Sequence, residues 1–193
     1  MPPACVESEM DPAIKLADWI LDRYPYWARD SVTHLKLQKL AFYAYGAALA
    51  HNVEHGIGVV AFEAWEHGPV SRDIWKIHRD RGSAPLARPS SAAGYVAPVE
   101  RVLNDALTVY GCLPAWTLRQ QSHLEKPWAD AWQSEDHHIP ADTLRAHFQS
   151  QFRAGDVRVP KYLLAGWSLG LDGLTEPRFE SLHELAEIVR SGS

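Results

Sequence analysis

The sequence predicts a mainly α-helical protein, a compact domain built around one buried central helix. Three observations lead to this prediction. The run from Thr33 to His51 has helical spacing and almost no polar face from Leu40 onward. Asp, Ser and Pro residues mark several further helix starts, and Val59–Trp65 is rich in β-branched and aromatic residues. With 46% hydrophobic and 22% charged residues, the composition is that of an ordinary globular protein.

The central helix is expected over Thr33–His51, which is about five turns of α-helix. Its apolar residues follow the spacing of a core-facing stripe, with a second apolar line beside it: Leu37, Leu40, Ala41, Ala44 and Ala48, then Leu35, Phe42 and Leu49. Thr33 has a hydroxyl that can cap the first turn. Lys36 and Lys39 lie on the one face that stays polar, and Tyr43 follows Lys39 by one turn.

The segments on either side of this helix carry clear signals for helix ends and turns. Asp11-Pro12 is a strong helix start, and Pro25 ends that first helix. Val59–Trp65 predicts a strand of one short β-hairpin or an extended arm, and Glu66–Pro69 predicts a tight turn. Pro69 or Ser71 then opens another helix.

The sequence from Ser83 onward predicts further helices and a division of the chain into two parts. Ser83–Ala97 is expected to be a mobile surface loop. Helices are expected from Pro98 to Gly111, from Pro114 to near Glu125, in a further turn that carries Trp132 after a break at Lys126–Trp128, and from Ile139 with Leu144, Phe148 and Phe152 inward. We expect one helical domain over residues 11–153 and a C-terminal extension over 154–193. The extension ends in a helix at Phe179–Arg190 and docks on the same domain.

Composition also limits the class of protein. The net charge of −5 argues against a large surface that neutralises phosphates. Cys5 and Cys112 are too few for a disulfide framework, the first residues lack the pattern of a signal peptide, and no run has the length of a membrane span. We therefore expect a cytoplasmic protein that makes no contact with a membrane.

Motifs for chemistry are missing. His51 and His55 lack the surrounding residues of a zinc helix, and His137-His138 would point their rings apart. Ser71 is better explained as a helix start than as a nucleophile. We expect no metal, no cofactor and no catalytic residue. Eight tryptophans in a chain without a catalytic constellation favour a protein-binding module over an enzyme.

Three segments in this order and spacing resemble the Panacea domain, the family of SocA-like antitoxins and phage-associated proteins. They are Thr33–Gly46 (THLKLQKLAFYAYG), Phe62–Val70 (FEAWEHGPV) and Leu118–Trp128 (LRQQSHLEKPW). The resemblance covers roughly Ala13 to Phe152. One departure is Ser122 before His123, where the family more often has Thr.

The resemblance implies an antitoxin that binds and neutralises a cognate toxin, mostly by direct contact. A SocA-like member of the adaptor kind would instead deliver a SocB-like toxin to the ClpXP protease. A polar groove for the partner is expected from Lys36, Lys39, Tyr43, Glu66 and His67. The other motif residues are expected to have structural roles, fixing the turn against the central helix or locking the end of a helix: Trp65, Gly68 and Pro69, then His123, Pro127 and Trp128.

Two other functions stay open at this point. One is a small hydrolase that uses His67 or His123. The other is a phage-associated regulator that binds nucleic acid, for which Arg79, Arg81 and Arg88 form only a weak basic cluster. Nucleic acid is the less expected partner, because no recognition motif accompanies this cluster.

Overall fold

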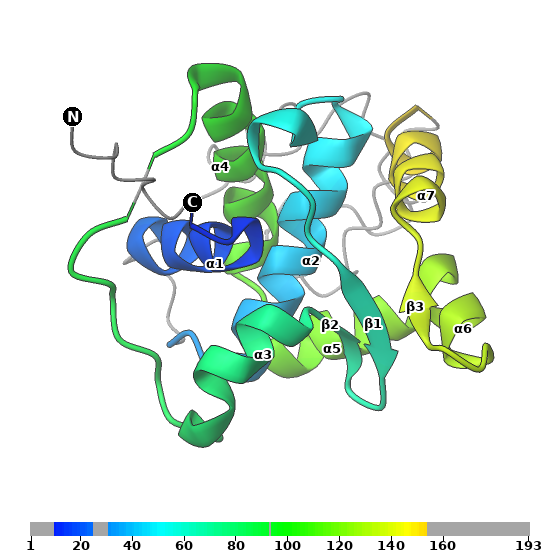
Figure 1. The fold of residues 1–193 in the computed structure, drawn as a ribbon, viewed down its shortest axis with the longest axis horizontal. Helices are drawn as coiled ribbons and strands as arrows, with labels where there is room; N and C mark the ends of the chain where they lie inside the picture. Colours follow the sequence, from blue (N-terminus) through cyan, green and yellow to red (C-terminus); the bar gives the residue numbers. More distant parts are fainter. Residues whose placement is uncertain (1–9, 25–30, 93, 154–193) are drawn as a thin grey trace, which may run out of the picture.

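A computed structural model describes residues 10–24, 31–92 and 94–153, and this part of the chain is mainly helical, as predicted (Figure 1). The helices are α1 (Pro12–Arg23), α2 (His34–Ala50), α3 (Arg72–His78), α4 (Ala97–Gly111), α5 (Ala115–Leu124), α6 (Lys126–Trp132) and α7 (Ala141–Arg153), with short 3-10 turns η1 (Glu54–Gly56) and η2 (Arg79–Arg81). A small sheet is formed by β1 (Phe62–Trp65), β2 (Gly68–Val70) and β3 (His138–Ile139).

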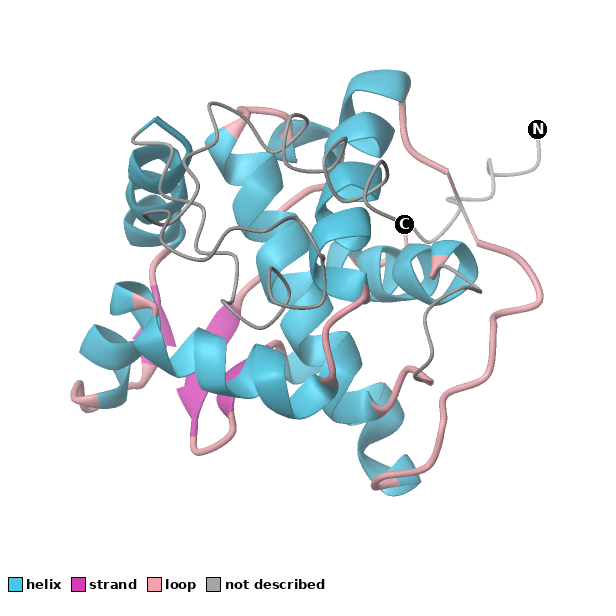
Figure 2. Cartoon of the chain, turned by 180° about the vertical axis from the view of Figure 1, so that it is seen from behind, coloured by secondary structure: helices cyan, strands magenta, loops and turns pink. Residues whose placement is uncertain are grey.

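Helix α2 is the centre of the fold. Thr33 is its N-cap, with the side-chain hydroxyl accepting from the Lys36 N–H, and His51 is its C-cap. Helices α1, α3, α4, α5 and α7 and strand β2 all contact it, so that Figures 1 and 2 show it surrounded on both sides. Every residue from Lys36 to Leu49 is buried. The predicted central helix is confirmed almost to the residue.

Most other helices begin where the sequence places a cap or a proline. Asp11 caps α1 by accepting from the Ala13 and Ile14 N–H groups, and Ser71 precedes α3. The expected break at Lys126–Trp128 is wrong, because this segment is the start of α6. Pro127 occupies the first turn of that helix, where a missing N–H costs nothing.

The predicted hairpin is also present. Strand β1 pairs antiparallel with β2, bringing Trp65 opposite Gly68 across a two-residue turn. Strand β3 has no counterpart among the predicted elements; it pairs Phe62 with Ile139 on the other edge of β1. Only two residues long, β3 is too short for an alternating pattern.

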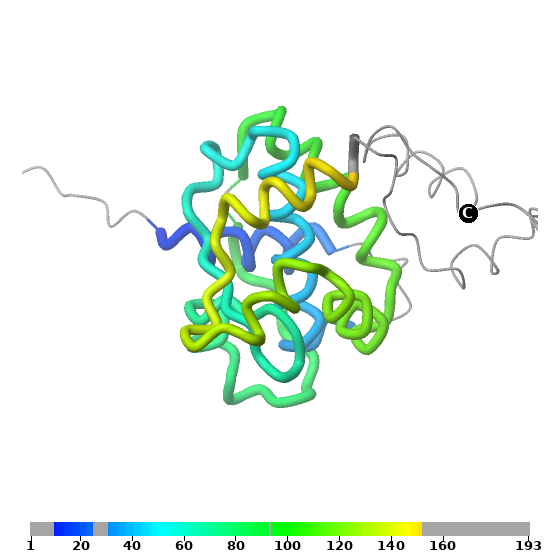
Figure 3. The backbone as a smooth tube through the Cα atoms, turned by 90° about the vertical axis from the view of Figure 1, so that its right-hand side faces the viewer, coloured from blue at the N-terminus to red at the C-terminus, as the bar shows by residue number. Residues whose placement is uncertain are grey.

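Aromatic rings fill the core between α2, α4 and α7. Tyr43 stacks on Tyr110 with centroids 4.3 Å apart, and Phe42 meets Phe148 edge-on at 5.7 Å. Gly46 makes this packing possible, because a Cβ at that position would overlap the ring of Phe148. In Figure 3, α7 (yellow) crosses α2 (light blue to cyan) obliquely.

Three further expectations concern the loop after α3, the C-terminal extension and membrane-spanning segments. Residues 83–96 carry neither helix nor strand over the described positions, as expected of a loop. The extension over 154–193 and its helix at Phe179–Arg190 lie outside the described residues. Among the helices in the described ranges, none combines the length and the apolar character needed to cross a membrane.

The contact between Gly46 and Phe148 leads to a stability prediction. Replacing a mid-helix glycine by alanine ordinarily stabilises a helix by about 0.5–1 kcal/mol. We expect Gly46→Ala to destabilise instead, by about 1–3 kcal/mol, because the new methyl group overpacks the core. Urea denaturation would measure the free energy of unfolding.

Two variants control this measurement. Gly94→Ala changes an exposed loop glycine whose nearest side chain is the flexible carboxylate of Glu100, so it should be nearly neutral. Adding Phe148→Leu to Gly46→Ala should recover part of the lost stability. A stabilising Gly46→Ala variant would contradict the packing described here.

Candidate functional site

The three segments that carry the family resemblance meet at one end of the molecule. Helix α2, the β1–β2 hairpin and the α5–α6 pair lie far apart in sequence but pack together there. Figure 2 shows α5 running in front of the sheet when the molecule is seen from behind. Polar side chains of α2 make the connection between these elements.

Gln38 and Lys39 hold the hairpin to the central helix. The side-chain amide of Gln38 accepts from the Ser71 N–H at 2.9 Å and donates to the Ser71 carbonyl oxygen at 3.2 Å. Lys39 Nζ donates to the Pro69 carbonyl oxygen at 2.8 Å. Both side chains are buried, so each bond satisfies a polar group that water cannot reach.

Gly68 allows the hairpin to approach this closely. Its φ of 92° lies in the region that favours glycine. A Cβ here would also lie 2.5 Å from Ser122 Oγ and 3.0 Å from Lys39 Nζ. The backbone of the hairpin thus lies directly between α2 and α5, where no side chain has room.

The predicted polar groove needs correction. Lys36 and Lys39 have no solvent exposure and Tyr43 only 1%, because α2 is covered on all sides. Lys36 Nζ donates to the hydroxyl of Tyr24, whose own O–H donates to the Gly111 carbonyl oxygen. The three α2 residues therefore cannot line an exposed groove, and their polar groups connect elements inside the fold.

Glu66 and His67, in contrast, are exposed at the tip of the hairpin. Arg119 of α5 reaches them, with 3.4 Å between its Nε and His67 Nδ1 and between its Nη2 and the Glu66 carbonyl oxygen. The guanidinium also lies over the ring of Trp116, 4.5 Å from its centroid. Trp116 is 58% exposed, an unusual position for a tryptophan.

A second row of rings continues from this point. His123 stacks on Trp128 with centroids 4.1 Å apart, and Trp128 stacks on Trp132 at 5.6 Å. The indole N–H of Trp128 donates to the Trp65 carbonyl oxygen, tying α6 to the hairpin, and Trp132 is 41% exposed. We call the connected set the α5–α6 strip; it consists of His67, Trp116, Arg119, His123, Trp128 and Trp132.

The other predicted structural residues lie beneath or beside this strip. Trp65 is half-buried and contacts Trp75, with centroids 5.4 Å apart. Gly68, Pro69 and Pro127 are buried. The backbone at Gly68 and Pro69 packs between α2 and α5 and so supports the strip, while Pro127 lies in the first turn of α6.

The electrostatics of this end are positive. Burial and the nearby Arg119 lower the pKa of Lys39 from 10.5 to about 7. Burial, Arg119 and Lys39 likewise lower the pKa of His123. Its Nε2 is buried without a hydrogen bond. A guanidinium close enough to lower the pKa of both groups is an arrangement that a negative group would stabilise.

A separate polar cluster surrounds Glu125, which follows α5. Its buried carboxylate accepts from the Tyr43 hydroxyl at 3.3 Å and from Gln151 Nε2 at 2.9 Å, and it pairs with His147 Nε2 at 2.6 Å. These contacts connect α2, the α5–α6 junction and α7. Tyr43 is thus a partner of Glu125 rather than of the hairpin turn.

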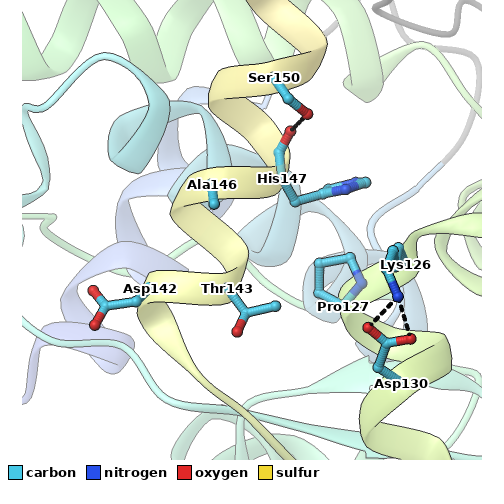
Figure 4. Close-up of a pocket in the computed structure, with 8 residues that line it drawn as sticks. All are labelled: Lys126, Pro127, Asp130, Asp142, Thr143, Ala146, His147 and Ser150. Atoms are coloured by element: carbon cyan, nitrogen blue, oxygen red, sulfur yellow. Dashed lines mark hydrogen bonds and ion pairs between the residues drawn. The ribbon is translucent and has the colours of Figure 1, made fainter.

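A cavity of about 520 Å³ opens between α6 and α7 beside this cluster (Figure 4). It is lined by Lys126, Pro127, Asp130, Asp142, Thr143, Ala146, His147 and Ser150. A carboxylate that orients a histidine next to a cavity is a feature of general bases. However, the Ser150 hydroxyl donates to the His147 carbonyl oxygen, and among the described residues no hydroxyl or thiol bonds the His147 ring.

No group of His, Cys, Asp and Glu side chains is arranged to hold a metal ion in the described part of the chain, residues 10–24, 31–92 and 94–153.

Comparisons with known proteins give no match. No family model matches the chain, and no curated protein or solved structure is significantly similar to it. The resemblance to the Panacea domain therefore stays a prediction.

Several residues of this site were not predicted from the sequence. Gln38 could have been suspected, because a polar residue in a fully buried helix must find an internal partner. Trp116 and Trp132 follow no apolar stripe, which is a weak sign of exposure. Arg119 and Glu125 carry no local signal of their roles, since their side chains bond segments 22 or more residues away, such as His147.

The state of Lys39 gives a pH prediction. Its pKa is about 7 in the folded protein against an ordinary value of 10.5, so between these pH values the unfolded chain binds more protons. The free energy of unfolding should therefore rise with pH over this range. The slope from this group is up to about 1.4 kcal/mol per pH unit.

The comparison needed is with Lys39→Met, which keeps the length of the side chain but cannot titrate. Urea denaturation at several pH values from 6 to 10 would yield the difference between the two proteins, in which other titrating groups cancel. We expect the free energy of unfolding of the wild type, relative to that of Lys39→Met, to increase with pH. A constant difference would show that Lys39 titrates normally.

Proposed function

We propose that this protein is a binding module that acts as the antitoxin of a toxin–antitoxin pair, neutralising a cognate toxin by holding it. The observation that supports this most is the convergence of the three family-like segments on one place, the α5–α6 strip. Gln38, Lys39 and Gly68 build the support, and exposed rings lie above it.

The composition of the strip fits a protein partner. Trp and Arg are the residues most enriched in the parts of interfaces that dominate affinity. Trp116 and Trp132 are exposed although both could bury large area, and Arg119 is stacked on Trp116. A rigid support under such side chains lowers the entropy lost on binding.

The hydrolase alternative has no comparable support. His67 is exposed beside Arg119, and His123 is stacked on Trp128. In the described part of the chain neither ring bonds a carboxylate that could orient it as a base. We propose no second function.

Co-expression with the product of the adjacent gene tests the proposal. The two proteins should co-purify, and growth inhibition by that product should be relieved. Trp116→Ala should weaken both effects at least about 10-fold, in line with loss of a central interface tryptophan. The matched control is Val59→Ala, at an apolar residue that is 79% exposed outside the strip.

The direct-blocking and adaptor forms of the proposal can then be separated. With purified ClpXP, an adaptor would accelerate degradation of a SocB-like toxin, whereas a blocker would leave its half-life unchanged or extend it. A chain that neither binds the adjacent product nor relieves its toxicity would overturn the antitoxin proposal.

A further inference from the structure

Arg119 lies at the centre of the α5–α6 strip with its charge uncompensated. Its guanidinium makes two long hydrogen bonds of 3.4 Å, to His67 Nδ1 and to the Glu66 carbonyl oxygen. Among the residues that the structure describes, no carboxylate pairs with it, although other arginines such as Arg72 and Arg145 form ion pairs of 2.6 and 2.8 Å. With five N–H donors, it keeps free capacity for an acceptor.

The position of the guanidinium is fixed by an aromatic face. Trp116 lies under it at 4.5 Å, and the two side chains are one turn apart on α5. Stacking of this kind orients the planar fork while leaving its edge available. The exposed indole supplies an apolar surface next to that edge.

The groups around Arg119 are an amine and two imidazoles, none of which is an acid. Lys39 is buried with its Nζ bonded to the Pro69 carbonyl oxygen, His67 Nδ1 bonds Arg119, and His123 lies one turn further along α5. Glu66, next to His67 in the hairpin turn, is exposed and contributes only its backbone oxygen to Arg119. In a chain of net charge −5, this local deficit of carboxylates stands out.

We propose that the strip binds an acidic segment of the partner protein, with a carboxylate held by Arg119 and an apolar side chain placed against Trp116. This inference rests on the proposed function and specifies the chemistry of the partner. A carboxylate matches the fork of one arginine in a bidentate way. A nucleic acid would need several phosphate contacts along its backbone, which the negative net charge opposes.

The partner segment is unknown, so the test uses a random peptide library displayed on phage and selected against the full-length protein. Parallel selections use Arg119→Gln and Trp116→Ala. The matched control is Arg101→Gln; Arg101 is exposed on α4 and forms no ion pair with the residues that the structure describes. Binding of individual peptides is then measured by fluorescence anisotropy.

We expect wild type and Arg101→Gln to enrich peptides in which Asp or Glu accompanies an apolar residue. Arg119→Gln should bind these peptides about 10-fold or more weakly, and replacing their Asp and Glu by Asn and Gln should cause a similar loss. Higher salt should weaken binding to the wild type. Thermal unfolding of each variant verifies that it is folded; Trp116→Ala gives an independent reading should Arg119→Gln not fold.

Three results would overturn the inference. The wild type could enrich no acidic peptides, or it could enrich acidic peptides that Arg119→Gln binds equally well. Light scattering could also show a dimer that Arg119→Gln dissociates, which would make a second copy of this chain the occupant.

These results are distinguishable from failure of the antitoxin proposal. If the wild type relieves toxicity and Arg119→Gln does so equally, the antitoxin proposal stands and the acidic segment falls. If the wild type relieves no toxicity but selects acidic peptides through Arg119, the surface chemistry stands and the antitoxin proposal falls.

Discussion

The structure depends on one constraint: a helix that is buried on all sides must satisfy its polar side chains from within the protein. In α2 the buried amide of Gln38 and the amine of Lys39 do this by bonding backbone groups at Ser71 and Pro69. An unsatisfied buried polar group costs about 1–3 kcal/mol, so these bonds help to fix the position of the hairpin on α2. The hairpin in turn supports α5 and α6, and with them every exposed ring of the strip.

Much of the fold was readable from the sequence because its signals are local. The apolar run of α2, the Asp11-Pro12 start and the β-branched segment before Trp65 each depend on a few neighbouring residues. The site was predicted less well, because it depends on distant contacts. Lys36 and Lys39 were expected to be exposed, as lysines usually are. Only the elements packed over α2 show that these residues are buried.

The motif residues therefore divide into two groups with different physical roles. Buried polar residues and glycine position the backbone, while Trp116, Trp132 and His67 are exposed and Arg119 is half-buried. The exposed residues can be substituted at little cost in stability, because most surface substitutions alter the free energy of unfolding by less than about 0.5 kcal/mol.

The contact between the Phe148 ring and Gly46 also has a consequence for folding during synthesis. Domains generally fold from the N-terminus as the chain is synthesised. Here the core of α2 is completed by a residue more than a hundred positions later, so a nascent chain still short of α7 exposes the faces of Phe42 and Tyr43 that this ring covers. Until residue 148 has left the ribosome, the central helix is a surface on which chaperones can act.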